Sequence, residues 1–287
     1  MDTAILQGLE YIRCNFLDVF FGIFTALGEE LIIAAIIAVV YICFDKRIGE
    51  RALVTVMTAS CFTTGIKSAV RRLRPYEAGV VPRVEIDNAL VSTLDLDADM
   101  SFPSGHATAT SGFFTTVALN IPKKWLIALC SVFTFLVVLS RLYLGVHYPT
   151  DVLCGLAIGI GCAFVWEYIY ARWYHSRLYI YLGIALLTLP LLFIARTATD
   201  SMFQISALTL ATAFGLLIED NFIRFENTPH WWKRGLRLAV VGLVALVVFL
   251  PLHLWLPEGH WSDFLKYFLT VFAALTVAPF LIRILKI

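Results

Sequence analysis

Long apolar segments recur along the chain, and they constrain its fold more than any other feature. Their positions are about 25–44, 51–72, 104–120, 125–143, 150–171, 178–195, 201–218, 236–256 and 264–285. A helix needs roughly 20 mainly apolar residues to cross the hydrocarbon core of a bilayer, and these segments are close to that length. Of all residues 60% are hydrophobic and 15% are charged, whereas soluble domains are about 45–50% apolar and about 25% charged. The sequence therefore predicts an all-α, polytopic membrane helical bundle.

The first 28 residues differ from these segments because polar side chains interrupt them. The charged residues there are Asp2, Glu10, Arg13 and Asp18. Their alternation with Ile, Leu and Phe is typical of an amphipathic helix in the membrane interface, followed by a short piece that enters the membrane. We expect the first full span to run from near Thr25 to near Phe44, with Glu29 and Glu30 at the water interface. No cleavable signal peptide is evident, since no basic region opens the sequence.

Charge and cysteine content argue against several classes of function. The formal net charge of +1 gives no basis for a nucleic-acid partner. The six cysteines are Cys14, Cys43, Cys61, Cys130, Cys154 and Cys162. Five of them lie in apolar segments and none has the spacing of a metal site, so we interpret them as small core residues.

The distribution of Lys and Arg predicts the orientation in the membrane. If successive spans alternate in direction, 13 basic residues lie on one side and nine on the other. The side with 13, which includes Lys123, Arg224 and Lys286, is expected to face the cytoplasm. We therefore expect a multi-pass protein of the cell membrane, with the three polar clusters described next on the extracytoplasmic side.

The first polar cluster is Lys-Ser-Ala-Val-Arg-Arg-Leu-Arg-Pro at residues 67–75. Lys67 and Arg74 are seven positions apart, within about 20° of two full helical turns, and Arg71 lies near the same face. A helix ending at the proline would present a basic stripe suited to bidentate phosphate contact. Basic residues beside a span also serve as simple membrane anchors, and we interpret Arg72, which points away from the stripe, in this way.

The second polar cluster is Pro-Ser-Gly-His at residues 103–106. Ser104 is placed to cap the next helix, and Gly105 lets an anion approach the N–H groups of the first turn. His106 lies in that same turn. A helix cap with an incidental histidine would have the same sequence, so this cluster alone does not distinguish a phosphate site from a structural cap.

The third polar cluster, residues 140–151, has the pattern Ser-Arg-x5-His-x3-Asp. Arg141 closes one helix, and Pro149 is suited to begin the next. Asp151 is placed to accept from the Nδ1–H group of His147, which leaves Nε2 free to attack. The structural alternative is a buried His–Asp pair that only braces the start of a helix.

The three clusters are more specific together than apart, because the predicted topology brings them to one membrane face. With Lys-x6-Arg-Pro, Pro-Ser-Gly-His and Ser-Arg-x5-His-x3-Asp, the chain resembles the type 2 phosphatidic acid phosphatase superfamily over roughly residues 10–172. The resemblance implies a six-helix phosphatase core, here followed by about four extra C-terminal transmembrane helices.

The resemblance also implies a role for each residue of the clusters. His147 would be the nucleophile that forms a phosphohistidine, Asp151 would orient it, and His106 would protonate the leaving alkoxide. The phosphoryl oxygens would be held by Lys67, Arg74, Ser104, Gly105 and Arg141. No metal or other cofactor is needed in that family, and fixed cations with helix N–H groups are able to stabilise the same charge.

Two regions depart from a minimal family member. The segment 76–102 is long and acidic, and it fails as a calcium loop because Met100 stands where that loop needs glycine. We interpret it as a solvated loop or a substrate lid. The extension 173–287 contains no motif that indicates a role, and we separate it as a second region from the core at 1–172. Its tryptophans Trp231, Trp232, Trp255 and Trp261 are expected at the membrane interface.

Three hypotheses about function follow. The first is a metal-independent membrane phosphatase that hydrolyses phosphatidic acid, phosphatidylglycerol phosphate, a polyprenyl diphosphate or a sphingoid-base phosphate. The second uses the same site to hydrolyse a sugar phosphate or to transfer a phosphate-bearing headgroup. The third is a lipid-binding or transport protein with a vestigial site, against which the joint presence of His106, His147 and Asp151 argues. A membrane lipid in the bilayer is the expected partner, and the oligomeric state is left open.

Overall fold

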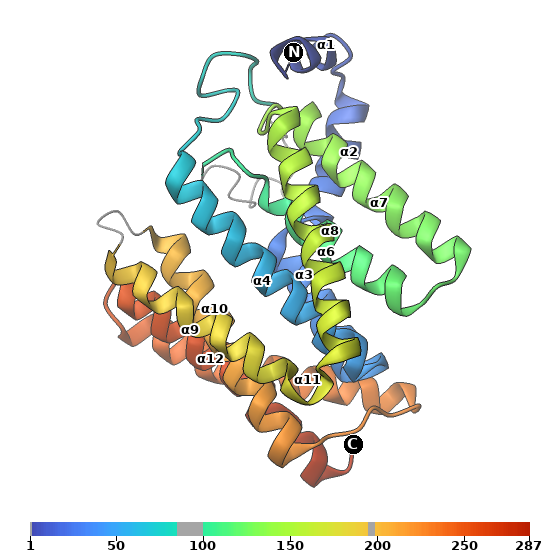
Figure 1. Cartoon of the computed structure of the whole chain (residues 1–287), viewed down its shortest axis with the longest axis vertical. Coiled ribbons are helices and arrows are strands. Elements are labelled where there is room, and N and C mark those ends of the chain that lie inside the picture. Colours follow the sequence, from blue (N-terminus) through green and yellow to red (C-terminus); the bar gives the residue numbers. More distant parts are fainter. Residues whose placement is uncertain (1, 85–99, 195–198) are drawn as a thin grey trace. The chain divides into compact units, whose positions relative to one another are not determined.

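Helices are the only regular elements in the part of the chain that the computed structural model describes, residues 2–84, 100–194 and 199–287 (Figure 1). In chain order they are α1 (Asp2–Glu10), α2 (Asn15–Leu27), α3 (Glu30–Val39), η1 (Val40–Phe44), α4 (Lys46–Val70), α6 (Gly105–Asn120), α7 (Lys124–Tyr143), α8 (Pro149–Arg172), η2 (Tyr174–Ser176), α9 (Arg177–Ile194), α10 (Asp200–Ile218), η3 (Glu219–Ile223), α11 (Trp231–Trp255) and α12 (His260–Leu285). The predicted all-α membrane bundle is confirmed. Most of the acidic segment 76–102 lies outside the described residues.

Six helical segments are long and apolar enough to cross a membrane. They are α4, α7, α8, α10 with η3, α11 and α12. A seventh candidate is the pair formed by α2 and the continuous segment Glu30–Phe44. Two of the nine expected spans do not meet this test of length and apolar character within the described residues. α6 has only 16 residues, and α9 is not among the helices that pass.

The first expected span is broken rather than continuous. Gly28 ends α2, with its N–H group donating to the main-chain oxygen of Phe24 at 3.0 Å. A Cβ atom at Gly28 would lie 2.4 Å from Cγ1 of Val137, so α7 passes too close for any side chain there. The chain then turns by 54° before Glu30. The prediction of one helix from Thr25 to Phe44 is wrong, because tertiary packing at a glycine overrides the apolar pattern.

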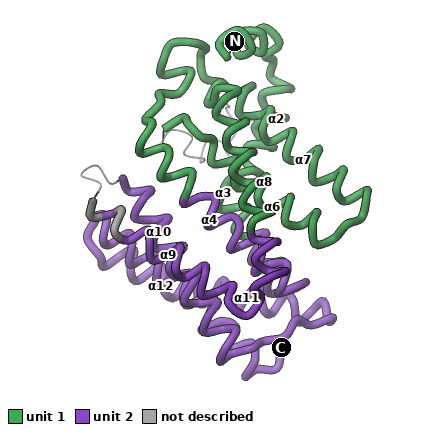
Figure 2. Tube along the Cα trace, in the orientation of Figure 1, with its two compact units in different colours: residues 1–35, 62–165 green, residues 36–61, 166–287 purple. Residues whose placement is uncertain are grey.

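The described chain forms two compact units (Figure 2). Unit 1 consists of residues 1–35 and 62–165, and unit 2 consists of residues 36–61 and 166–287. All three polar clusters fall in unit 1. The division at residue 172 that we expect from the sequence remains a prediction about domains.

In unit 1, α6 and α8 approach each other through glycine. A Cβ atom at Gly155 would lie 2.6 Å from the main-chain oxygen of Ser104, and one at Gly159 would lie 2.2 Å from Oγ of Ser111. Small residues permit such close packing of membrane helices. Gly161 on the same helix differs, because nothing lies within 4 Å of an added Cβ atom there.

In unit 2, a buried ion pair joins α4 to α9. Arg177 donates through Nε to Oε1 of Glu50 at 2.7 Å, and the hydroxyl of Tyr170 donates to the same oxygen at 2.8 Å. α10 and α11 both pack against α12. Unlike its neighbours, α11 has no buried residue in its most apolar 18-residue window, so this helix faces outward over its membrane-spanning length.

Candidate active site

Four helices of unit 1 and the segments beside them supply the residues of the three polar clusters. They are Lys67 at the end of α4, Arg74 in the turn that follows it, Ser104–His106 at the start of α6, Arg141 at the end of α7, His147 in the next loop and Asp151 at the start of α8. The main-chain N–H of Ser104 donates to the main-chain oxygen of Asp151 at 3.1 Å. A Cβ atom on Gly105 would lie 3.9 Å from Nζ of Lys67. These contacts bring the three clusters together.

Arg74 reaches the site from a turn rather than from a helix. The helix α4 ends at Val70, and Arg71 adopts a left-handed φ of 50°, a common way to terminate a helix. The side chain of Arg71 turns back to donate to the main-chain oxygen of Ser68 at 3.0 Å and is exposed. Arg74 is only 5% exposed. The prediction of a continuous basic stripe through Arg71 is therefore wrong, although Lys67 and Arg74 are both buried as a binding role requires.

One hydrogen bond fixes the proton on the His147 ring. Nδ1 of His147 lies 2.8 Å from the main-chain oxygen of Ser101. A carbonyl oxygen only accepts, so Nδ1 must carry the hydrogen and donate it. Nε2 of the neutral ring therefore keeps its lone pair and is the nitrogen available for attack.

Asp151 holds this ring less directly than its spacing predicts. Its Oδ2 atom lies 3.5 Å from Nδ1 of His147, farther than the 2.8 Å of the bond to Ser101. Oδ2 accepts instead from Oγ of Ser101 and from the N–H of Tyr148, the latter at 2.8 Å. The fully buried carboxylate thus positions Ser101, and the carbonyl of Ser101 positions His147.

Arg72 neutralises the buried Asp151. Its Nη1 atom lies 2.9 Å from Oδ1 of Asp151 and donates to Oγ1 of Thr150 at 2.7 Å. The guanidinium also lies over the ring of Tyr148, 3.7 Å from its centre. A buried carboxylate needs such a partner, because leaving it uncompensated is strongly destabilising. The interpretation of Arg72 as a simple membrane anchor is wrong.

Three cations are buried in this region. Lys67 is 9% exposed, Arg74 is 5% exposed and Arg141 is 1% exposed. Nη1 of Arg141 donates to Oγ1 of Thr25, whereas its Nε has no hydrogen-bond partner among the described residues. A buried guanidinium donor without an acceptor is uncommon in proteins. Together the three side chains are suited to an anion with several oxygens, which would satisfy that donor and offset the cost of burying the charges.

The same surroundings keep His147 uncharged. Burial, followed by the positive charges of Arg141, Arg74 and Lys67, lowers the pKa of His147 well below its ordinary value. A neutral imidazole has the lone pair that nucleophilic attack requires.

His106 has a carboxylate neighbour that the sequence patterns did not predict. Nε2 of His106 lies 3.0 Å from Oε2 of Glu29, which occupies the bend between α2 and α3. Burial and the charge of Arg141 lower the pKa of His106 to about 4, and the Glu29 carboxylate opposes this shift by favouring the protonated ring, the form needed to donate a proton. The signal available in the sequence was a carboxylate inside an apolar segment, which often marks a functional position.

The start of α6 is arranged to receive negative charge. Oγ of Ser104 accepts from the N–H of Ala107, as the predicted cap requires. A Cβ atom on Gly105 would lie 2.5 Å from Oε1 of Glu30, the end of a flexible side chain, so the absence of a side chain at Gly105 leaves room beside the first turn. The N-terminus of a helix attracts anions through its free N–H groups and its dipole.

Comparisons with known proteins agree with this chemistry. Residues 51–175 match the sequence model of the PAP2 superfamily, and residues 203–287 match that of the PAP2 superfamily phosphatase, transmembrane extension. The chain is 30% identical over 129 residues to a lipid A 1-phosphatase of Rhizobium etli, with 44% of this chain and 51% of the relative covered. It is 38% identical over 94 residues to a decaprenylphosphoryl-5-phosphoribose phosphatase of Mycobacterium tuberculosis, with 33% and 45% covered.

A crystal structure of LpxE from Aquifex aeolicus matches with a TM-score of 0.47 and 25% identity, over 57% of this chain and 93% of that chain. The chain spans about half the length of the two curated relatives, 51% and 45%. Residues 51–175, which match the PAP2 model, contain all three polar clusters.

Proposed function

The chain belongs to the PAP2 superfamily, and we propose that it is an integral membrane phosphatase that hydrolyses lipid phosphate monoesters or diphosphates through a phosphohistidine. The relatives named above are phosphatases of lipid-linked substrates. The helices long enough to cross a bilayer support a substrate that approaches from the membrane.

In the first step, Nε2 of His147 attacks phosphorus, a nitrogen–phosphorus bond forms, and the bond to the lipid oxygen breaks. His106 donates its proton to the leaving oxygen. Glu29 and the negative charge of the bound phosphate oppose the burial and the Arg141 charge that lower the pKa of this ring to about 4. Lys67, Arg74 and Arg141, with the first turn of α6, hold the remaining phosphoryl oxygens. Ser104 and Gly105 provide that first turn.

In the second step, water attacks the phosphohistidine and gives a proton to His106. An oxygen–phosphorus bond forms, the nitrogen–phosphorus bond breaks, and inorganic phosphate leaves. His147 returns to its neutral form, with the hydrogen of Nδ1 still donated to Ser101. Asp151 acts as a positioning residue throughout, through Ser101.

One observation carries this proposal: buried Arg141 has an Nε without a hydrogen-bond partner among the described residues, and its charge helps to lower the pKa of the buried His147. A phosphoryl group bound at His147 would offer the buried Nε–H of Arg141 an oxygen to which it can donate. Three fixed cations also supply the charge stabilisation that a divalent metal would otherwise give, so we expect activity to resist chelators.

Orientation and substrate are parts of the same proposal. The Lys and Arg distribution supports a site on the extracytoplasmic side of the cell membrane. The site would hold a terminal phosphate group, which is common to phosphatidic acid, phosphatidylglycerol phosphate, a polyprenyl diphosphate and a sphingoid-base phosphate.

The test is phosphate release by the purified chain in detergent with EDTA present. The panel contains those four lipids and glucose 6-phosphate, and the variants are His147→Ala and, as a matched control, His175→Ala at an exposed histidine. We expect release from at least one lipid, a loss of about 10³-fold or more in His147→Ala, and no change in His175→Ala.

Release from glucose 6-phosphate alone would favour a soluble substrate instead. A folded chain that binds these lipids but releases no phosphate would contradict the proposal and favour transfer or transport.

A further inference from the structure

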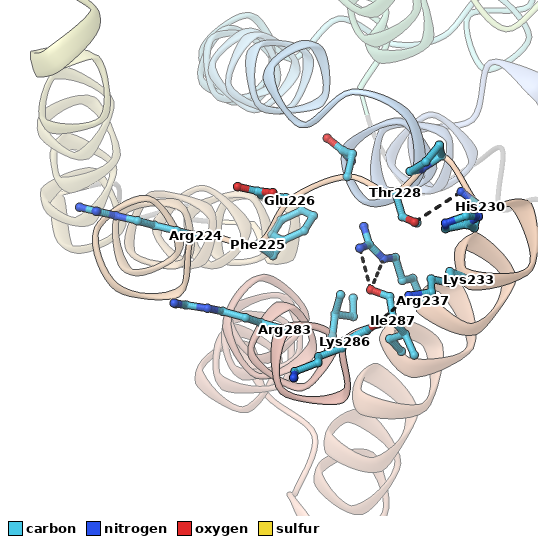
Figure 3. Close-up of a pocket in the computed structure, with 13 residues that line it drawn as sticks. Arg224, Phe225, Glu226, Thr228, His230, Lys233, Arg237, Arg283, Lys286 and Ile287 are labelled. Carbon is cyan, nitrogen blue, oxygen red and sulfur yellow. Dashed lines mark hydrogen bonds between the residues drawn. The ribbon is translucent and has the colours of Figure 1, made fainter.

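Unit 2 contains a second concentration of positive charge. A pocket of about 480 Å³ lies where the segment after η3, the start of α11 and the end of α12 meet (Figure 3). Its cations are Arg224, Lys233, Arg237, Arg283 and Lys286. Glu226 is the only acidic side chain among the 13 residues that line it. Its volume is within the usual range for small-ligand sites, about 300–1,000 Å³.

Main-chain oxygens, not carboxylate side chains, hold these cations in place. Nη1 of Arg237 donates to the main-chain oxygen of Ile42 at 3.3 Å, and its Nη2 donates at 2.7 Å to an oxygen of Ile287, the last residue of the sequence, a contact drawn in Figure 3. Nζ of Lys233 donates to the main-chain oxygen of Lys286 at 2.7 Å. Arg283 and Arg224 likewise donate to main-chain oxygens.

No ion pair with a carboxylate side chain involves any of the five within the described ranges. Bonds to internal main-chain oxygens orient Arg224, Lys233 and Arg283 without cancelling their charges, so the pocket keeps a positive potential that an anion would relieve.

The pocket lies beside features of a membrane surface. Trp231 and Trp232 open α11 and are 81% and 48% exposed. Tryptophan side chains concentrate at the boundary between headgroups and hydrocarbon. The apolar length of α11 that follows has no buried residue in its most apolar window, as expected for a helix facing lipid. The pocket residues Lys233 and Arg237 on α11 are therefore placed near headgroup depth.

We propose that this pocket binds a phosphate group, carried either by an anionic lipid headgroup or by a phosphate compound in solution. Guanidinium groups form paired hydrogen bonds with phosphate oxygens, and basic clusters next to a membrane span attract anionic headgroups. The binding is separate from hydrolysis, because none of the pocket residues belongs to the candidate active site.

The test compares two double variants of the full chain. Arg224→Gln with Lys286→Gln removes two exposed pocket cations and keeps a polar side chain at each position. Lys123→Gln with Lys124→Gln removes the same charge from exposed positions at the start of α7. Both retain every candidate active-site residue, so phosphate bound there is common to all samples.

Two assays distinguish the sources of phosphate. In the lipid assay, protein from nanodiscs of phosphatidylcholine with a minor fraction of phosphatidylglycerol is analysed by native mass spectrometry for retained lipid. In the solution assay, labelled inorganic phosphate is dialysed to equilibrium against protein in phosphatidylcholine nanodiscs. Given the usual contribution of one cation near a membrane surface, losing two should weaken binding roughly 30-fold in one assay.

A loss confined to the lipid assay assigns a headgroup site, and a loss confined to the solution assay assigns a site for soluble phosphate. Unchanged binding in both assays overturns the proposal, as does an equal loss in the Lys123→Gln, Lys124→Gln control. If the pocket double variant does not purify as a single species, Lys286→Gln alone is carried through the same assays.

Discussion

At the scale of single residues, the orientation of His147 depends on groups outside the three motifs. Ser101 fixes the hydrogen on Nδ1 through its carbonyl and donates its hydroxyl to Asp151. Arg72 provides the neutralising charge for that carboxylate. A pattern of spacings along one helix reports which side chains share a face, but it does not show a carbonyl contributed from a loop 46 positions away in sequence. The helix expected through Arg72 therefore gave no sign of its ion pair with Asp151.

Removing the charge of Arg72 should impair turnover more than binding. In Arg72→Gln we expect kcat to fall roughly tenfold, equivalent to about 1.4 kcal/mol, with KM little changed. The reason is that Asp151 would lose its cation, and Ser101 and His147 would lose their fixed arrangement. The measurement is steady-state phosphate release in detergent.

Arg71→Gln is the matched control, because Arg71 is exposed and its side chain donates locally, to the main-chain oxygen of Ser68. Equal effects of the two substitutions, or a change confined to KM, would count against the positioning role of Arg72.

The lowered pKa of His147 predicts how stability depends on pH. An unfolded histidine titrates near 6.5, and the folded ring titrates well below that value because of burial and nearby cations. Between the two values the unfolded chain binds a proton that the folded chain does not, so stability falls as pH decreases from about 6.5. The slope from this one group is at most about 1.4 kcal/mol per pH unit.

Thermal midpoints in phosphate-free detergent buffer test this dependence. We expect the midpoint of the wild-type chain to fall more between neutral and acidic pH than that of His147→Gln, which lacks the titrating ring. Parallel curves would show that His147 is not held neutral.

At the scale of elements, the close approach of α6 and α8 places the second and third clusters together. Small residues in the sequence are compatible with such packing, but the sequence does not show which glycines meet another helix. A Cβ atom at Gly159 would lie 2.3 Å from the main-chain oxygen of Thr108, and main-chain atoms cannot move aside without moving a helix. The bend at Gly28 was equally hidden, since its cause is the approach of Val137 on another helix.

Substitution at Gly159 should therefore separate the two helices. We expect Gly159→Ala to cost roughly 1–3 kcal/mol of stability. It should also reduce activity, because separating α6 from α8 would disturb the main-chain hydrogen bond between Ser104 and Asp151 that joins the second and third clusters. Thermal unfolding and phosphate release measure the two effects.

Gly161→Ala is the control on the same helix, with open space around the new methyl group. It should be neutral or stabilising by up to about 1 kcal/mol, since alanine favours a helix over glycine. If Gly159→Ala behaves like Gly161→Ala, the proposed close packing is contradicted.

At the scale of the whole molecule, hydropathy predicted the membrane class, because every long apolar segment must be covered by lipid or by another helix. By length alone, α6 with its 16 residues falls short of a complete span. Orientation rests on the basic residues alone. Cys14 provides a natural probe of it, because it is exposed and its N–H donates to the hydroxyl of Tyr143 at 3.2 Å, at the Arg141 end of α7.

A membrane-impermeant maleimide should label Cys14 in intact cells, and Cys14→Ser should remove that labelling. In the Cys14→Ser background, Lys123→Cys at the opposite end of α7 should react only after the cells are permeabilised. The reverse pattern would place the candidate active site on the cytoplasmic side.

The central claim is that phosphate passes through His147 before it reaches water. The stereochemistry at phosphorus tests it most directly, because each in-line displacement inverts the configuration. A phosphorothioate analogue of the preferred lipid, chiral at phosphorus, would be hydrolysed in isotopically labelled water and the product thiophosphate analysed. Two displacements through a phosphohistidine predict retention of configuration. Inversion would show that water attacks the substrate directly, and it would contradict the nucleophilic role of His147.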